Sequence, residues 1–300
     1  MSHILLLFID GVGIGEADPV KNPFFAGKFK FFSEFFRESP HLEKQFLSGE
    51  SIELFPIDAC MGIDGIPQSG TGQTSIFCGV NAPALINQHF GPFPYSTLIP
   101  VIKEQNIFID FLNRKKKVFF MNSYPQLFFD YINSGKSRLS VSTLSYRSAG
   151  LELNTADGVR SGYSLSAEIT NRVWRERLKY EDIAQITPEA AAERLLSRTA
   201  ENDLTVYEFF LTDHLGHGRI PHDFDIITSD LDRFLIHIFS NYNRQDTEIL
   251  LCSDHGNFED ISIKAHTRNP ALGIAAGKHC ALLRDRITSL DKIKQVLLEL

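Results

Sequence analysis

The sequence predicts an α/β fold with a mostly parallel central sheet flanked by helices and a small inserted segment. Short apolar runs of strand length alternate with stretches of helical period, the pattern of strands joined by crossover helices. The 300 residues, 43% of them hydrophobic and 22% charged, suffice for one large or two modest globular domains. Acidic residues follow three of the strand-like runs within two residues, where a parallel sheet collects its functional groups.

The expected strands are short apolar runs bounded by polar residues. The first reads ILLLFI, occupies 4–9 and stops at Asp10. The others lie at 118–121, 206–211, 249–252 and 271–275. Such runs are typical of a parallel sheet that helices cover.

Helices are expected between these strands, at 97–113, 188–199, 224–239 and 289–300. The helix at 188–199 has a defined start, with Thr187 as its N-cap and Pro188 in its first turn. Phenylalanines crowd the segment 24–36, and those at 25, 29, 32 and 36 fall on one face of an expected helix. We interpret that helix as buried against the sheet.

The pattern changes between residues 124 and 185, where Ser, Thr, Tyr, Arg and Gly replace any sustained apolar period. Structureless loops of such length are rare in compact domains. We therefore expect 124–185 to form a lid or small cap, inserted into an α/β core made of 1–123 and 186–300.

Charge and cysteine content narrow the range of partners. The net charge of −7 and the pI of about 5.8 offer no basic field for a nucleic acid. The first apolar run is far shorter than the ~20 residues of a membrane span, so no membrane partner and no export are expected. The cysteines stand singly, without a CxxC pair, which indicates reduced thiols and a cytoplasmic protein.

Three carboxylates, those of Asp10, Asp213 and Asp254, follow strand-like runs. The carboxyl ends of parallel strands open on one edge of the sheet, so these side chains are expected to converge there. Converging carboxylates repel one another. A bound cation is the simplest remedy, and the sequence therefore predicts a metal site.

Histidines accompany these carboxylates. TDHLGH contains His214 and His217, SDHGN contains His255, and His266 follows in AHTRNP. Mixed Asp and His ligands suit Zn²⁺ or Mn²⁺, whereas Mg²⁺ and Ca²⁺ prefer oxygen alone. Asp213 and His217 stand four residues apart, so one helical turn would place both on one face. A structural hydrogen bond explains any one of these residues, but not the whole set.

The glycine-rich segment 67–79, PQSGTGQTSIFCG, lacks the lysine of a nucleotide-binding P-loop. The earlier DGVGIG is also no dinucleotide fingerprint, because Glu16 stands where a third glycine is needed. Ser69 precedes small residues and an apolar run of helical length, so its hydroxyl is expected at a helix N-terminus, which favours negative charge. On this segment alone, a role as N-cap explains Ser69 equally well.

Taken together, these residues resemble the alkaline phosphatase superfamily of metalloenzymes, most of all its branch of cofactor-independent phosphoglycerate mutase and phosphopentomutase. The family pattern is an Asp after the first strand, a Ser or Thr in [ST]xxG opening a helix that ends near a Gly about ten residues on, a DxxGH, a DHG and a final His. The matching positions are Asp10, Ser69 with Gly72 and Gly79, 213–217, 254–256 and His266. Their order and spacing span nearly the whole chain.

The resemblance implies two divalent metal ions, Mn²⁺ or Zn²⁺, and an alkaline phosphatase-like core. The implied ligands are Asp10, Asp254 and His255 for one ion, and Asp213, His217 and His266 for the other. Ser69 would lie between the ions, contact them and act as the nucleophile. Thr71 is a competing hydroxyl, but the spacing to Gly72 and Gly79 favours Ser69. Relatives often carry His or Arg where this chain has Gln73, which is a further candidate for substrate binding.

The implied function is two-metal phosphoryl transfer through a phosphoserine, as a phosphatase or phosphodiesterase on a small phosphate ester. Alternatives are a phosphomutase resembling phosphoglycerate mutase, and a catalytically silent metal-binding protein, which has no need of a hydroxyl between its metals. A sulfatase would need a CxPxR context that is missing here. An oxidoreductase built on DGVGIG lacks the third glycine.

Arginines are the expected phosphate ligands, because a guanidinium binds phosphate with two parallel hydrogen bonds. The candidates are Arg147, Arg160 and Arg172 in the inserted segment and Arg268 beside His266. A solvated face or a salt bridge is an alternative role for each. The sequence discloses neither the substrate nor the oligomeric state.

Overall fold

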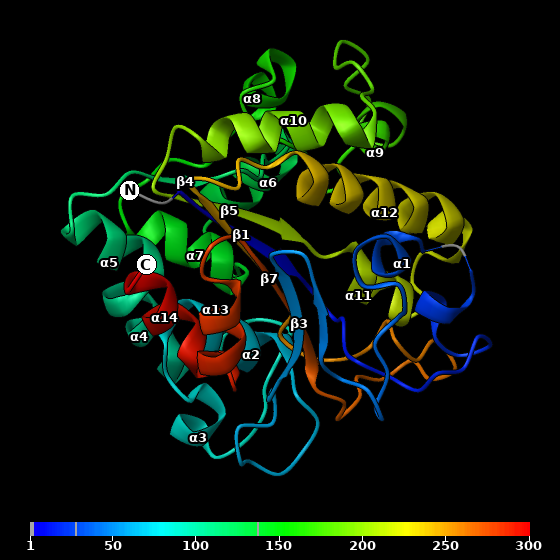
Figure 1. Ribbon diagram of the computed structural model, residues 1–300. Helices are drawn as coiled ribbons and strands as arrows, with labels where there is room; N and C mark the ends of the chain where they lie inside the picture. The colour runs from blue at the N-terminus through cyan, green and yellow to red at the C-terminus, as the bar shows by residue number, and fades with distance from the viewer. Residues whose placement is uncertain (1–2, 28, 137) are drawn as a thin grey trace.

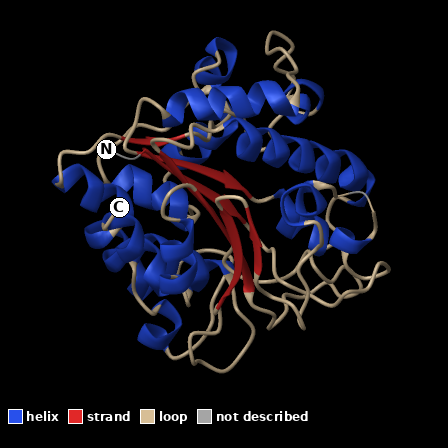
Figure 2. Ribbon diagram, in the orientation of Figure 1, coloured by secondary structure: helices blue, strands red, loops and turns tan. Residues whose placement is uncertain are grey.

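The computed structural model describes residues 3–27, 29–136 and 138–300, which form a central sheet with helices on both faces (Figure 2). The seven strands lie in the order β2-β3-β7-β6-β1-β5-β4. Their bounds are β1 His3–Ile9, β2 Leu47–Gly49, β3 Ile52–Ile57, β4 Val118–Phe120, β5 Leu204–Phe209, β6 Thr247–Cys252 and β7 Ala271–Ala276.

The middle of the sheet is parallel and confirms the expected fold class. β1 pairs in parallel with both β5 and β6, and β4 pairs in parallel with β5. Every residue of β5 and β6 is buried, which explains why these strands read as continuous apolar runs rather than alternating ones. All five expected strands are present, with ends shifted by one or two residues at most positions.

The other edge of the sheet departs from the expected pattern. β7 runs antiparallel to both β6 and β3, and β2 is antiparallel to β3. The sequence reading missed β2 and β3. β2 is too short for a periodic signal, and β3 contains Pro56, a residue that argues against a strand inside a sheet.

The helices divide between the two faces of the sheet (Figure 1). One hydrophobic cluster joins the sheet to α1, α10 and α12, and a second joins it to α2, α4, α5, α7, α13 and α14. The α-helix bounds are α1 Phe31–Phe36, α2 Ser69–Cys78, α3 Ala82–Ile86, α4 Ile99–Gln105, α5 Ile107–Asn113, α6 Gln126–Asn133, α7 Val141–Ser148, α8 Ala156–Ser161, α9 Arg172–Glu176, α10 Pro188–Thr199, α11 Leu211–Gly216, α12 Phe224–Asn241, α13 Cys280–Arg286 and α14 Ile293–Leu298. Short 3-10 turns are η1 Pro23–Phe25, η2 Ser96–Leu98, η3 Pro221–Asp223 and η4 Leu290–Lys292.

Two of the expected helices form as the sequence indicates. α10 starts after Thr187, whose hydroxyl accepts a hydrogen bond from the Ala190 amide at 3.2 Å. α12 covers the expected 224–239 and continues to Asn241.

The other helical expectations need correction. The segment 97–113 is split into η2, α4 and α5, because the Asn106 side chain accepts the Phe108 and Ile109 amides and so starts a new helix. The segment 289–300 becomes η4 followed by α14. The phenylalanine segment is not one helix either: Phe25 ends η1, and among the described residues of 24–36, which exclude residue 28, the α-helix covers 31–36. Its aromatic rings still pack into the hydrophobic core, although they do not lie on one face of a single helix.

The segment 124–185 contains α6, α7, α8 and α9. Val141 and Tyr146 of α7 belong to the hydrophobic cluster that also holds α2, α4 and α5. Val159, Trp174 and Ile183 form a small cluster of their own. No helix in the described residues is long and apolar enough to cross a lipid bilayer.

Candidate metal centre

The candidate site lies at the edge of the sheet where the parallel strands end. β1 stops at Ile9 and is followed by Asp10, and β6 stops at Cys252, two residues before Asp254. β5 leads into α11, whose first turn carries Asp213. The Thr212 hydroxyl donates to the Asp10 carbonyl at 2.5 Å, which ties the ends of β1 and β5 together. The expected convergence of the three carboxylates is confirmed.

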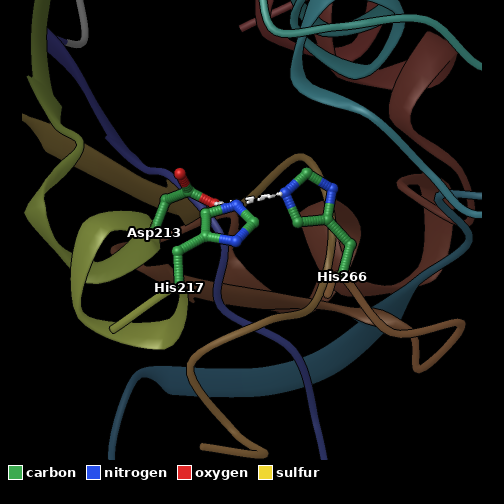
Figure 3. A group of neighbouring side chains, drawn as sticks. All are labelled: Asp213, His217 and His266. Carbon is green, nitrogen blue, oxygen red and sulfur yellow. Dashed lines mark hydrogen bonds and ion pairs between the residues drawn. The ribbon is translucent and has the colours of Figure 1, made fainter. Parts of the chain in front are cut away.

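One group of side chains consists of Asp213, His217 and His266 (Figure 3). Both Nε2 atoms lie 3.2 Å from Oδ1 of Asp213, and they are 3.0 Å from each other. Asp213 and His217 share α11 and its C-cap, one helical turn apart, as their spacing indicated. His266 reaches the same point from the loop that precedes β7.

The second group consists of Asp10, Asp254 and His255. Nε2 of His255 lies 3.3 Å from Oδ1 of Asp10 and 3.5 Å from Oδ2 of Asp254. The rings of His255 and His266 stack with their centroids 3.7 Å apart, so the two groups are neighbours. The structure thus divides the six residues into the same two sets that the family resemblance implied.

The hydrogen bonds of the imidazoles prepare them for a cation. Nδ1 of His217 lies 2.7 Å from the Lys264 carbonyl, and Nδ1 of His266 lies 2.9 Å from the Pro67 carbonyl. A carbonyl can only accept, so each Nδ1 carries a proton and each Nε2 is the ring nitrogen directed toward Asp213. Both Nε2 atoms and the carboxylate are thus placed to share one proton or one cation. A divalent cation satisfies this arrangement, and the residues therefore fit one.

In the second group, the Asp10 carboxylate lacks a hydrogen-bond donor for one of its oxygens within the described part of the chain. Its Oδ1 atom is buried and has no hydrogen-bond partner among the described residues. Burial, followed by the charges of Asp254 and Asp213, raises the pKa of Asp10 well above its ordinary value. A carboxylate in such surroundings favours a bound cation or a proton, and mixed oxygen and nitrogen ligands suit Zn²⁺ or Mn²⁺.

The pKa of the Asp213 carboxyl is shifted in the opposite direction to that of Asp10. Its burial alone would raise its pKa, but the hydrogen bond to His266 and the nearby His255 and His217 lower it. His266 responds in kind: burial opposes its charged form, yet the bond to Asp213 raises its pKa. The pKa of His255 is lowered by burial, which keeps this imidazole neutral and able to ligate a metal.

Ser69 is the first residue of α2, and Gln68, rather than Ser69, occupies the N-cap position. The Ser69 hydroxyl is buried 3.0 Å from Nε2 of His255, at the positive end of the helix dipole. The hydroxyl of Thr71 instead bonds the Gln68 carbonyl at 3.1 Å, within its own turn. Gly79 ends α2 in the left-handed conformation, with φ of 68°, as the spacing suggested.

Glycine lets α2 approach the metal groups. A Cβ atom on Gly72 would lie 2.9 Å from the Cβ and the carbonyl oxygen of Asp254. Gln73 follows directly, one turn after Ser69, and its Nε2 lies 3.3 Å from Oδ2 of Asp10 and 3.5 Å from Oδ2 of Asp254. Gln73 therefore does reach the site and donates to carboxylates of the second group.

Ser69, Gln73, Asp10 and Asp213 open into a cavity of about 760 Å³. The four arginines expected to bind phosphate do not line it. The arginines that line this cavity are instead Arg138, Arg177 and Arg219, which were not predicted from the sequence.

The expected arginines have other surroundings. Arg160 lies at the surface between Asp157 and Asp182, and Arg172 pairs with Asp223 at 2.9 Å. Arg268 donates to the Gly65 carbonyl and lines a small separate cavity. Arg147 lines another cavity, next to the one at Ser69. The presence of an arginine near the expected ligands in sequence did not predict a place in the Ser69 cavity. The position of each guanidinium depends on how distant segments pack together.

Sequence reasoning also missed two residues that hold the site together. The buried Glu259 carboxylate accepts hydrogen bonds from the Gly13 amide at 2.9 Å, the Asn257 amide at 2.7 Å, the Thr267 hydroxyl at 2.5 Å and the Asn269 side chain at 3.0 Å. Asn257 in turn donates to Oδ1 of Asp213 at 3.0 Å. The only available signal was their place in SDHGNFED, just after two of the expected ligands.

Comparisons with known proteins agree with this geometry. Residues 175–299 match the family model of the Metalloenzyme superfamily. No curated protein matches the chain. Among solved structures, the chain is similar to the PH0037 protein of Pyrococcus horikoshii, with 13% identity and a TM-score of 0.50 over 92% of this chain and 85% of the other. It is also similar to the alkaline phosphatase of the Antarctic bacterium TAB5, with 11% identity and a TM-score of 0.51 over 99% and 96%.

The seven-stranded sheet and its helices form an alkaline phosphatase-like fold. The match over 175–299 contains Asp213, His217, Asp254, His255 and His266. The partial family match and the fold agree with the resemblance drawn from the sequence.

Proposed function

We propose that the protein is a phosphatase or phosphodiesterase that uses Ser69 as its nucleophile and two divalent metal ions, Mn²⁺ or Zn²⁺. The observation that carries the proposal is the Ser69 hydroxyl, which is 3.0 Å from His255 and shares a cavity with Asp213 of the other group. A catalytically silent metal protein would have no use for a hydroxyl at that point.

The metal ions would supply Lewis acidity, lowering the pKa of the serine and neutralising the phosphoryl oxygens. Asp10, Asp254 and His255 would hold one of them, and Asp213, His217 and His266 the other. Gln73 donates to carboxylates of the second group and keeps them oriented. The α2 N-terminus adds amide donors and a positive dipole where negative charge develops.

The reaction follows from the position of Ser69. Its Oγ atom forms a bond to phosphorus while the bond from phosphorus to the ester oxygen breaks and the alcohol leaves with a proton. Water then breaks the Oγ–phosphorus bond, which restores the serine hydroxyl and releases phosphate from a monoester or a phosphomonoester from a diester. Transfer of the phosphoryl group to a second hydroxyl of a retained substrate would instead make the enzyme a phosphomutase.

The decisive experiment compares Ser69→Ala with Thr71→Ala in metal-loaded protein. Ser69→Ala should lower turnover of phosphate esters by orders of magnitude while metal content stays near wild type, because Asp and His provide most ligands. Mass spectrometry after acid quenching should find phosphate on the peptide with Ser69. Thr71→Ala should be far milder, since its hydroxyl bonds its own turn. Near-normal turnover in Ser69→Ala would overturn the proposal.

A further inference from the structure

A second cavity of about 720 Å³ adjoins the one at Ser69 and is rich in positive charge. Its polar lining includes Lys103, Lys136, Arg138 and Arg147, and no carboxylate of a described residue lines it. This is unusual in a chain whose net charge is −7. A cavity lined by positively charged side chains raises the local concentration of anions.

All four cations are exposed to solvent, and among the described residues none of Lys103, Lys136, Arg138 and Arg147 forms an ion pair with a carboxylate. Lys136 lies over the ring of Tyr131, 5.4 Å from its centroid, a contact that leaves its charge uncompensated. Like charges around one cavity repel, and a bound anion relieves that repulsion. The arginines add the planar donors that bind carboxylate or phosphate in pairs.

The two cavities share a wall. Phe93, Arg138 and Leu139 line both of them. A ligand whose phosphoryl group meets Ser69 has to pass these three residues to reach the second cavity.

Much of the wall of the first cavity is apolar. In the first cavity, Tyr124 and Phe128 stack with ring centroids 4.3 Å apart, and Trp174 and Leu178 also line it. Such walls favour a hydrocarbon or aromatic group over the hydroxyls of a sugar.

We propose that the second cavity binds a second anionic group of the substrate. The substrate class is then a phosphate ester of an apolar alcohol that carries an anionic group at its far end. This inference rests on the proposed function and specifies which esters the Ser69 site accepts.

The test uses two series of phosphate monoesters of increasing chain length. One series contains alkyl phosphates, and the other contains ω-carboxyalkyl phosphates of the same lengths. At the length that spans the cavities, the carboxylate should raise kcat/KM by about tenfold or more over the matched alkyl ester, the value of one charge-assisted hydrogen bond. Shorter esters should show no such gain.

The variants Lys103→Gln and Arg147→Gln should each remove most of the gain and leave kcat/KM of the alkyl esters near wild type. Arg138 is spared because it also lines the Ser69 cavity. Lys278→Gln is the matched control: Lys278 is exposed and follows β7 at the opposite edge of the sheet from Asp254. It should leave the gain intact. Thermal unfolding of each variant checks that it folds.

Two results would overturn the inference. One is hydrolysis of alkyl esters without a carboxylate gain at any length, and the other is an equal loss for both series in Arg147→Gln. Both leave the proposed function standing, provided that alkyl ester turnover still depends on Ser69. If neither series is turned over and Ser69 is never phosphorylated, the proposed function itself fails, and this inference with it.

Discussion

The carboxylate of Glu259 shows how a single residue outside the ligand groups can position both of them. Its four hydrogen bonds come from the loop after Asp10, the loop after His255 and the segment after His266. A Cβ atom on Gly13 or Gly256 would lie within 2.7 Å of it, so these loops close directly onto the carboxylate. Glu259 therefore couples the positions of residues that are distant in sequence.

We expect Glu259→Gln to weaken the binding of Mn²⁺ or Zn²⁺ by about 10- to 100-fold, the range seen when an outer-shell partner is lost. Each carboxylate oxygen of Glu259 accepts two donors, so the amide NH₂ of glutamine must oppose one pair of them. Calorimetric titration of metal-stripped protein measures the affinity. The exposed Glu43 provides the control variant Glu43→Gln. Unchanged affinity in Glu259→Gln would contradict the positioning role.

Glu168 predicts a dependence of stability on pH. Burial raises the pKa of this carboxyl to about 7, although the Trp174 and Val173 amides partly offset the effect. The unfolded chain ionises near pH 4.5, so Glu168 lowers the free energy of unfolding as pH rises from about 4.5 through 7. Between about pH 5.5 and 8 the loss amounts to about 2 kcal/mol.

Glu168→Gln should remove that loss. Urea unfolding at both pH values should find the variant gaining about 2 kcal/mol relative to wild type as pH rises. Glutamine can still accept the Val173 amide, so α9 should keep its start. A difference between variant and wild type that does not change with pH would show that Glu168 titrates normally.

At the scale of elements, α2 matters most, because its N-terminal turn carries Ser69 and its glycines allow close packing. A Cβ atom on Gly70 would lie 2.2 Å from the Phe93 carbonyl oxygen, and one on Gly72 would meet Asp254 at 2.9 Å. The helix and the Asp254 loop therefore approach each other more closely than any side chain permits.

Gly72→Ala tests this packing. Helix propensity alone would favour alanine by about 1 kcal/mol. The contact with the Asp254 backbone should outweigh this preference and destabilise the protein by about 1–3 kcal/mol. Turnover should also fall, because Ser69 and Asp254 are pushed apart. Thermal unfolding and kcat are the measurements, and a more stable, fully active variant would contradict the close packing.

At the scale of the whole molecule, the candidate centre joins segments from both ends of the chain. Asp10 follows the first strand, and His266 precedes the last one. A ligand bound only by the folded state stabilises it by mass action, and a site assembled from such distant segments forms only on folding.

Removal of metal should therefore lower the thermal unfolding midpoint of the entire protein. Dialysis against EDTA followed by Mn²⁺ or Zn²⁺ should lower and then restore Tm, and elemental analysis should return about two metals per chain. His217→Ala and His266→Ala should each lose one metal preferentially. A metal-free protein with full activity and unchanged Tm would refute the two-metal centre.

The sequence by itself determined the parallel half of the sheet, the start of α10 and the convergence of the three carboxylates. Each has a local signal: continuous apolar runs, a Thr–Pro pair, and carboxylates placed where strands end. Parallel strands that end on one edge bring Asp10, Asp213 and Asp254 together whatever the details of packing. The spacing of Asp213 and His217 fits a helical turn for the same local reason.

Only the tertiary structure decided the features that depend on contacts between distant segments. The antiparallel half of the sheet, the split of the phenylalanine segment, the role of Glu259 and the surroundings of Arg147 belong to this group. Their residue types are compatible with several environments, and the choice among them follows from packing and charge compensation across the whole fold. For the same reason, two cavities that share Phe93 and Arg138 could be recognised only in three dimensions.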